Sequence, residues 1–256
     1  MSCLRIAFAN QKGGVGKSTF CTQVAFYLAL RDKKRVLVVD MDAQGNSTST
    51  LLKQEENQEL TGTETNALFA PDTTSIEPMH LQCGIDLIGT RKNDRLSYEL
   101  EAVDLERAVF PKQYIDSIAD QYDYILFDCP PSLGRKLISV LLATEYVVCP
   151  VKLSGYAVDG LEGLFQTLFD IQGEFNPNLK ILGAIINEYD RSNSHNEALA
   201  LVREAIPNLI FKSIVCHRSP IDTASLKGEP VWKVKNGWRA AEEIKAVVKE
   251  LKQKLK

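Results

Sequence analysis

The chain has 256 residues, of which 45% are apolar and 25% charged, with a net charge of −3. This composition can fill one large core, and it excludes a low-complexity chain. Six cysteines stand without any C-x-x-C pair, which argues against a disulfide framework or a zinc site and favours a reducing cytosol. No run has the apolar length of a membrane span and no signal peptide is evident, so we expect a cytoplasmic protein.

The charge is unevenly distributed along the chain. Between Lys227 and Lys256, nine Lys or Arg residues stand against four Glu, a local net charge of +5, which leaves −8 for the rest of the sequence. Such asymmetry favours an anionic partner, either nucleic acid or a membrane surface. The alternative is the solvated face of an ordinary terminal helix.

Short β-rich runs alternate with helical patterns throughout. We predict a strand at 4–10, a helix from Lys17 to about Arg31 and a strand at 35–42, followed by strands at 84–90, 122–128, 146–151, 180–187 and 209–215. Continuous apolar runs of this kind are typical of strands covered on both faces. The fold class is therefore α/β, a doubly wound, mainly parallel sheet with helices on both faces, in one domain over residues 1–256. For the polar stretch between Asn46 and His80 we predict a short helix, a mobile loop and no strand.

The glycine-rich stretch QKGGVGKSTF, residues 11–20, lies between the first strand and the first helix. Its bare backbone can wrap an anion with N–H groups, and the helix N-terminus adds a favourable dipole. Lys17 is expected to reach the terminal phosphates, Ser18 to ligate Mg²⁺ and Thr19 to donate to an inner phosphate. The predicted nucleotide-binding residues here are Gly13, Gly14, Val15, Gly16, Lys17, Ser18 and Thr19. The alternative is a glycine-rich turn with a helix cap.

Acidic residues follow two of the apolar strands. Asp128 ends the run YDYILFD, where ligands of open α/β sheets bind, and we expect it to hold Mg²⁺ through water. Asp40 and Asp42 end the second strand two residues apart, so both side chains leave one face if strand geometry holds. We assign Asp42 to the attacking water and Asp40 to the metal side. The alternative for this pair is two solvated strand-end carboxylates.

Three motifs together resemble one family. KGGVGKST, DMDAQGNST and FDCPPSLG are similar to the deviant Walker A ATPases of the ParA and MinD group, most closely to the short plasmid-partition ParA proteins. CPVKLSGYAVDGL (149–161) and GEPVWKVK (228–235) extend the likeness over nearly the whole chain. The resemblance implies a P-loop ATPase domain without an N-terminal helix-turn-helix domain, binding ATP and Mg²⁺. Ala43 and Cys129 depart from the family's usual proline and threonine, but neither change removes a ligand.

The resemblance also implies residue roles. The early lysine, Lys12, would reach across a nucleotide-sandwich homodimer to the phosphates of the other subunit, where such a cation is worth about 10³ to 10⁵ in rate. Lys12, Lys17 and Asp42 would then be the catalytic residues. Asn187 corresponds to the position that contacts adenine, and Pro220 lies in the segment that borders the base.

The implied cycle is DNA partition. ATP-bound dimers would bind double-stranded DNA without sequence preference on the nucleoid, and a centromere-binding ParB-type partner would stimulate a weak ATPase and release them, segregating a plasmid or chromosome. The alternative is a MinD-like or cargo-positioning ATPase for another cellular structure. A small-molecule ligase of the same superfamily would need a substrate pocket. A relative of the nitrogenase iron protein would need glycine-flanked, cluster-binding cysteines, which are missing from this sequence.

The C-terminal helix helps to decide whether the anionic partner is DNA or a membrane. Apolar residues from Ala240 to Leu255 follow helical spacing and lysines lie mostly on the other side. A membrane-binding helix would present larger apolar residues, so we expect no membrane. DNA contacts are predicted at Arg218, Lys233, Lys235, Arg239 and Lys245.

Overall fold

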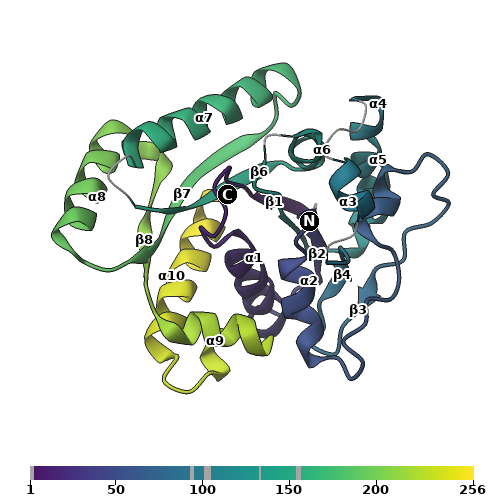
Figure 1. Ribbon diagram of the computed structural model, residues 1–256, viewed down its shortest axis with the longest axis horizontal. Coiled ribbons are helices and arrows are strands. Elements are labelled where there is room, and N and C mark those ends of the chain that lie inside the picture. The colour runs from purple at the N-terminus through teal and green to yellow at the C-terminus, as the bar shows by residue number, and fades with distance from the viewer. Residues whose placement is uncertain (1–2, 93–94, 101–104, 133, 154–156) are drawn as a thin grey trace.

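The computed structural model describes residues 3–92, 95–100, 105–132, 134–153 and 157–256. Within them the strands form one eight-stranded sheet in the order β3-β4-β2-β5-β1-β6-β7-β8, parallel except for the antiparallel pair β3 and β4 (Figure 1). The strands are β1 Leu4–Phe8, β2 Val36–Asp40, β3 Met79–His80, β4 Asp86–Ile88, β5 Tyr124–Asp128, β6 Tyr146–Lys152, β7 Lys180–Tyr189 and β8 Ile210–Cys216. The predicted mainly parallel α/β sheet is confirmed.

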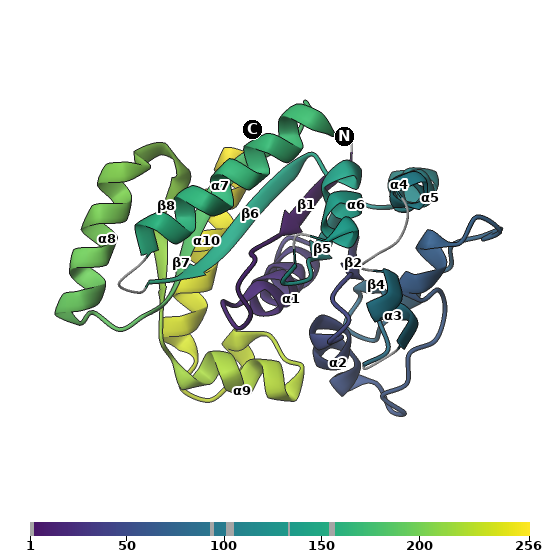
Figure 2. The same ribbon diagram turned by 45° about the horizontal axis from the view of Figure 1, so that its top comes forward.

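Helices cover both faces of this sheet (Figures 1 and 2). One buried apolar cluster lies between the sheet and α5, α6, α7 and α8; a second lies between the sheet and α1, α9 and α10. The helices are α1 Lys17–Phe26, α2 Asn46–Leu51, α3 Arg95–Glu99, α4 Leu105–Ala108, α5 Phe110–Ile118, α6 Arg135–Ala143, α7 Ala157–Glu174, α8 Asn193–Ala205, α9 Ser219–Lys227 and α10 Trp238–Lys254. Every residue of β2 and β5 is buried, which explains their continuous apolar runs.

Two elements differ from the sequence pattern. The helix predicted from Lys17 to Arg31 changes to a π-helical turn over Tyr27–Arg31. The prediction of no strand between Asn46 and His80 is wrong at its end, because Met79–His80 pairs with Leu87 and Asp86 as β3. A two-residue edge strand is too short to show an alternating pattern. The short helix expected in this stretch is α2.

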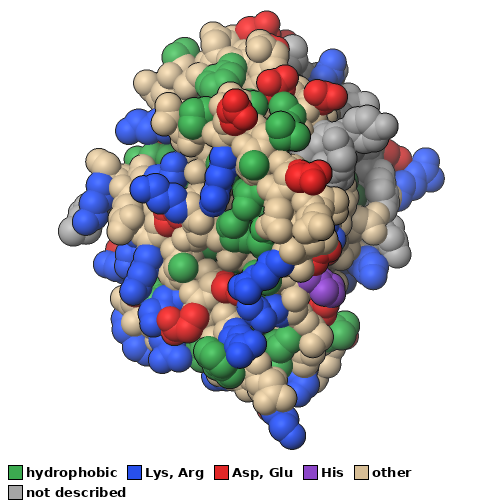
Figure 3. Space-filling model, turned by 90° about the vertical axis from the view of Figure 1, so that its left-hand side faces the viewer, with side chains coloured by type: hydrophobic (Ala, Val, Ile, Leu, Met, Phe, Trp, Pro, Cys, Tyr) green, Lys and Arg blue, Asp and Glu red, His purple; other side chains and the backbone are tan. Residues whose placement is uncertain are grey.

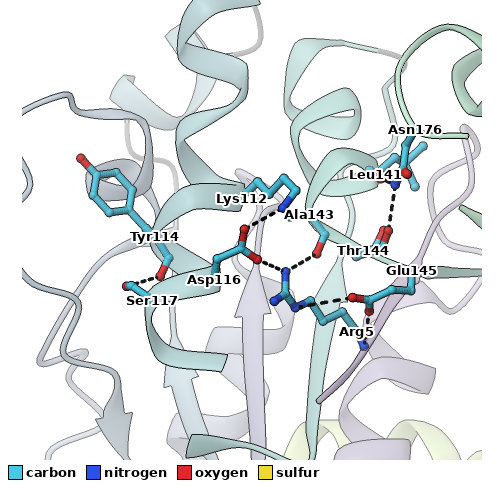
Figure 4. Close-up of polar contacts among 10 residues, drawn as sticks. All are labelled: Arg5, Lys112, Tyr114, Asp116, Ser117, Leu141, Ala143, Thr144, Glu145 and Asn176. Carbon is cyan, nitrogen blue, oxygen red and sulfur yellow. Dashed lines mark hydrogen bonds and ion pairs between the residues drawn. The ribbon is translucent and has the colours of Figure 1, made fainter. Parts of the chain in front are cut away.

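Polar contacts fix the start of β1 (Figure 4). The Arg5 guanidinium bonds to Asp116 of α5 and to the carbonyl of Ala143 at the end of α6, while the Arg5 amide donates to Glu145 at 3.0 Å. Lys112 donates to the same Asp116 at 2.6 Å. These contacts tie the N-terminal end of β1 to α5 and α6.

The C-terminal helix α10 is a core helix with a basic outer face. Its residues Ala240, Ile244, Val247, Val248 and Leu251 are buried, as the helical spacing predicts. In the part of the chain that the structure describes, no helix combines the length and apolar character that crossing a bilayer requires.

Candidate nucleotide site

A pocket of about 690 Å³ lies at the C-terminal ends of the parallel strands. The loop after β1, the loop after β2, and the ends of β7 and β8 all contribute to it, together with α9. Its lining includes Gly13, Gly14, Gly16, Lys17, Ser18, Thr19, Asp42, Asn187 and Arg218. Ligands of open α/β sheets bind at this edge, so segments far apart in sequence meet where chemistry is expected.

The glycine loop has the geometry of an anion cradle. Gly14 and Gly16 have φ of 68° and 102°, a region that favours glycine. A Cβ on Gly16 would lie 2.4 Å from the Asn187 amide nitrogen, whereas at Gly13 and Gly14 it would meet nothing within 4 Å. The backbone there is open toward the pocket. Lys17 is buried, and its ammonium donates to the carbonyl of Lys12 at 3.2 Å.

Lys12 occupies a different position from Lys17. It is exposed and does not belong to the residues lining the pocket, and its ammonium lies 3.5 Å from where a Cβ on Gly160 of α7 would stand. The Lys12 amide donates to the Asn10 side chain at 2.9 Å, and Asn10 in turn donates to the Pro150 carbonyl at 2.8 Å. Asn10, which the sequence did not single out, thus fastens the start of the loop to β6. One lysine faces the pocket and the other faces outward.

Asp128 has, beside the loop, one carboxylate oxygen without a hydrogen-bond partner in the described part of the chain. It is fully buried; Ser47 donates to its Oδ2 at 2.8 Å, and its Oδ1 has no hydrogen-bond partner within the described residues. Burial raises the pKa of Asp128 to about 6, against the opposing effect of the Ser18 and Ser47 hydroxyls. A buried, unpaired carboxylate oxygen near a hydroxyl is a suitable ligand set for Mg²⁺, which prefers oxygen. These residues therefore fit the metal expected at Ser18 and Asp128.

Asp40 and Asp42 lie in unlike surroundings. Asp40 is fully buried, accepts bonds from the Thr48 amide and hydroxyl at 2.8 Å each, and accepts the Asp42 amide at 3.2 Å. Burial, reinforced by the charge of Asp128, raises the pKa of Asp40 well above its ordinary value. Asp42 lines the pocket and accepts the Gln44 amide at 3.0 Å. Asp42 thus faces the ligand space, and Asp40 holds the first turn of α2; its metal-side role stays a prediction.

The two residues predicted near adenine have distinct locations. Asn187 lines the pocket, and its side chain donates to the Val15 carbonyl at 2.9 Å, so it also ties β7 to the glycine loop. Pro220 is the second residue of α9, between Arg218 and Ile221, which both line the pocket. Contact of either residue with a base stays a prediction.

The predicted DNA contacts are spread over a basic surface. Lys and Arg side chains gather over the middle and lower half of the face shown in Figure 3. Lys233, Lys235 and Arg239 are exposed, and Arg239 lines a hollow of about 540 Å³ with Arg191 and Arg218. Arg218 forms a two-pronged pair with Glu243, with a shortest distance of 2.6 Å, and Lys245 pairs with Glu242 at 3.0 Å. Those two cations are already engaged, and their role in binding DNA stays a prediction.

A glycine cradle between a parallel strand and a helix, a buried lysine within it and a buried acidic strand end beside it define a P-loop nucleotide-binding protein. Residues 4–181 match the AAA domain family. The chromosome-partitioning ATPase Soj of Thermus thermophilus is 36% identical over 217 residues, which cover 82% of this chain and 80% of Soj. The chain belongs to the ParA and Soj family of partition ATPases, which confirms the resemblance of its motifs.

Solved structures agree with this fold. A plasmid partition protein from Borrelia burgdorferi superposes with a TM-score of 0.78 at 22% identity, covering 99% of this chain and all of that one. Cobyrinic acid a,c-diamide synthase from Mycobacterium smegmatis, solved with a bound ATP analogue and magnesium, has a TM-score of 0.68 at 29% identity and covers 79% of this chain and 82% of that one.

Proposed function

We propose that this protein is an ATP-dependent switch for DNA partition that works as a homodimer with Mg²⁺. The observation that carries the proposal is the contrast between its two loop lysines, one buried in the pocket and one exposed outside it. The partition ATPase that resembles the chain over most of its length, and the related synthase with an ATP analogue and magnesium, support ATP as the ligand.

Hydrolysis rests on positioning and charge, because phosphoryl transfer needs little covalent chemistry from the protein. The open amides of the glycine loop and the Lys17 ammonium hold the phosphates. Mg²⁺, bound through Ser18 and Asp128, would neutralise charge on the phosphate oxygens. Asp42, whose carboxylate faces the pocket, orients the attacking water. Asn10 and Asn187 keep the loop in register with β6 and β7.

Dimerisation gives the exposed lysine its role. Lys12 is too far out to serve as a lining residue of its own pocket, yet its backbone is held by Asn10 and its side chain lies along α7. A second subunit closing over the pocket would receive this cation at its own phosphates. Hydrolysis is then coupled to assembly, since each active site is completed by its neighbour.

The basic surface supports binding to DNA. Lys233, Lys235 and Arg239 are exposed and offer non-specific contacts to DNA phosphates, which would place the protein on the nucleoid. A ParB-type centromere-binding partner would stimulate hydrolysis and release the dimer from DNA.

The test compares ATP turnover with and without DNA and the candidate partner in wild type, Lys12→Ala and Asp42→Ala. We expect Lys12→Ala to lose partner-stimulated turnover while still binding ATP, and Asp42→Ala to accumulate as an ATP-bound dimer. Full stimulated turnover in either variant would contradict the role assigned to that residue. An Asp42→Ala protein that stays monomeric with ATP at high concentration would overturn the proposal.

A further inference from the structure

The segment Gly228–Lys235, here called the strap, connects α9 to α10 and carries the motif GEPVWKVK. It begins at the C-terminal end of α9, where the Glu229 amide donates to the Ala224 carbonyl at 2.9 Å. The strap is thus hydrogen-bonded to the last turn of α9, so a contact that holds the strap also holds this end of the helix.

A buried glutamine of α1 clamps the strap. Gln23 has no exposed surface; its Nε2 donates to the Glu229 carbonyl at 3.1 Å, and its Oε1 accepts the Val231 amide at 2.8 Å. One side-chain amide therefore satisfies two backbone groups on either side of Pro230. Only a side chain with both a donor and an acceptor can make this pair of bonds. Gln23 lies six residues after Lys17, on the helix that starts at the glycine loop.

The strap also presses against α2 and the turn that follows it. Gly228 has φ of 65°, and a Cβ there would lie 2.3 Å from the Thr50 carbonyl and 2.6 Å from Lys53. Gln54 donates to the Lys227 carbonyl at 2.7 Å. The end of α9 is therefore held from two sides, by α1 through Gln23 and by the turn after α2 through Gln54.

The helix held in this way forms a wall of the pocket. Ile221, Asp222, Ser225 and Leu226 of α9 line it, and the Leu226 side chain is 75% exposed. The glycine loop takes the phosphate end of a nucleotide, so a bare apolar side chain on α9 is suited to the flat face of its base.

We infer that Gln23 is a positioning residue that fixes α9 as the base-side wall of the nucleotide pocket. The inference rests on the proposed function, since it assumes that ATP occupies this pocket. Without the clamp, α9 would hold its binding position for a smaller fraction of the time, and the apparent affinity for the nucleotide would fall by that fraction. Gln23 bonds to the strap and to neither the glycine loop nor Lys17, so we expect the binding of bare phosphates to be unchanged.

The experiment measures binding of the ATP analogue AMPPNP and of inorganic tripolyphosphate to the full chain by calorimetry with Mg²⁺. In Gln23→Leu we expect about tenfold weaker AMPPNP binding, as if the wall were in place about a tenth of the time, and unchanged tripolyphosphate binding. Gln54→Met removes the outer, exposed bond and should weaken AMPPNP alone, by about threefold, on the same reasoning. Gln172→Leu is the matched control, because Gln172 of α7 also donates to a backbone carbonyl, but that of Leu179, which belongs to neither the strap nor α9.

Equal loss for both ligands in Gln23→Leu, or no loss for AMPPNP, would overturn the inference and leave the proposed function standing. If Gln23→Leu does not fold, Gln54→Met decides, and the absence of a selective loss of AMPPNP would overturn the inference. A wild-type chain that binds neither ligand would overturn the proposed function and the inference with it.

Discussion

Replacing Asp128 with asparagine should stabilise the ligand-free protein at neutral and higher pH. The pKa of this buried carboxyl is about 6 in the folded protein and 3.8 ordinarily. Between these two values the folded protein keeps a proton that the unfolded chain has released, so the free energy of unfolding falls as the pH rises. The full cost of ionising Asp128 on this basis is about 3 kcal/mol above pH 6. Asparagine has nearly the same shape, can still accept the bond from Ser47, and escapes this cost.

The assay is urea unfolding of wild type and Asp128→Asn at pH 4 and pH 8, without and with Mg²⁺ and ADP. We expect the variant to be about 2 to 3 kcal/mol more stable than wild type at pH 8 and close to wild type near pH 4. With Mg²⁺ and ADP the order should reverse, because the carboxylate that destabilises the free protein is the one the metal needs. A variant no more stable than wild type at pH 8 without Mg²⁺ would refute this reasoning.

Three further predictions concern stability and DNA. Gly183→Ala should lower the free energy of unfolding by about 3 kcal/mol, because Gly183 has φ of 117° and a Cβ there would lie 2.4 Å from the Leu209 carbonyl; thermal melting checks this. Glu243→Gln should cost about 1 to 2 kcal/mol at pH 7. Although burial opposes it, the bonds from Arg218 and the Cys216 amide lower the pKa of Glu243 below its ordinary value of 4.5. This stability is therefore present above pH 4.5 and is lost as the pH falls through the lower folded pKa, where the variant's deficit should disappear. DNA affinity of the ATP-bound form, measured by fluorescence anisotropy, should fall by roughly 10³ between 50 and 200 mM salt if about six phosphates are neutralised; a flat response would exclude the basic surface as the contact.

Features set by neighbouring residues could be predicted from the sequence. The glycine spacing placed the phosphate loop, and the apolar runs of β2 and β5 placed Asp40 and Asp128 at strand ends, because a strand buried on both faces allows no polar residue before its end. The fold class followed from the same runs.

Features set by distant contacts could not be predicted. Their spacing predicted that Asp40 and Asp42 would act as a pair at one site. In the structure the amide and hydroxyl of Thr48, in the first turn of α2, instead donate to Asp40. Asn187 and Gln23 reach their partners across 172 and more than 200 residues of chain, and no local pattern reports such contacts. For the contact of Thr48 with Asp40, one local pattern pointed in the right direction. The run NSTST after DMDAQG predicts a helix start beside Asp40, since Ser and Thr are common at helix N-termini.

The central strand is also the earliest in the chain. β1 lies between β5 and β6, where Leu4 pairs with Tyr124 and Ile6 pairs with Tyr146. The first strand to be synthesised therefore has both neighbours only after Tyr146 has been made. During synthesis the middle of the sheet therefore stays open until more than half of the chain has emerged, and closing it requires long-range parallel pairing, which slows folding. The phosphate loop, though made first, becomes a binding site only at the end of this process, so a nucleotide can stabilise the completed molecule but cannot guide its early folding.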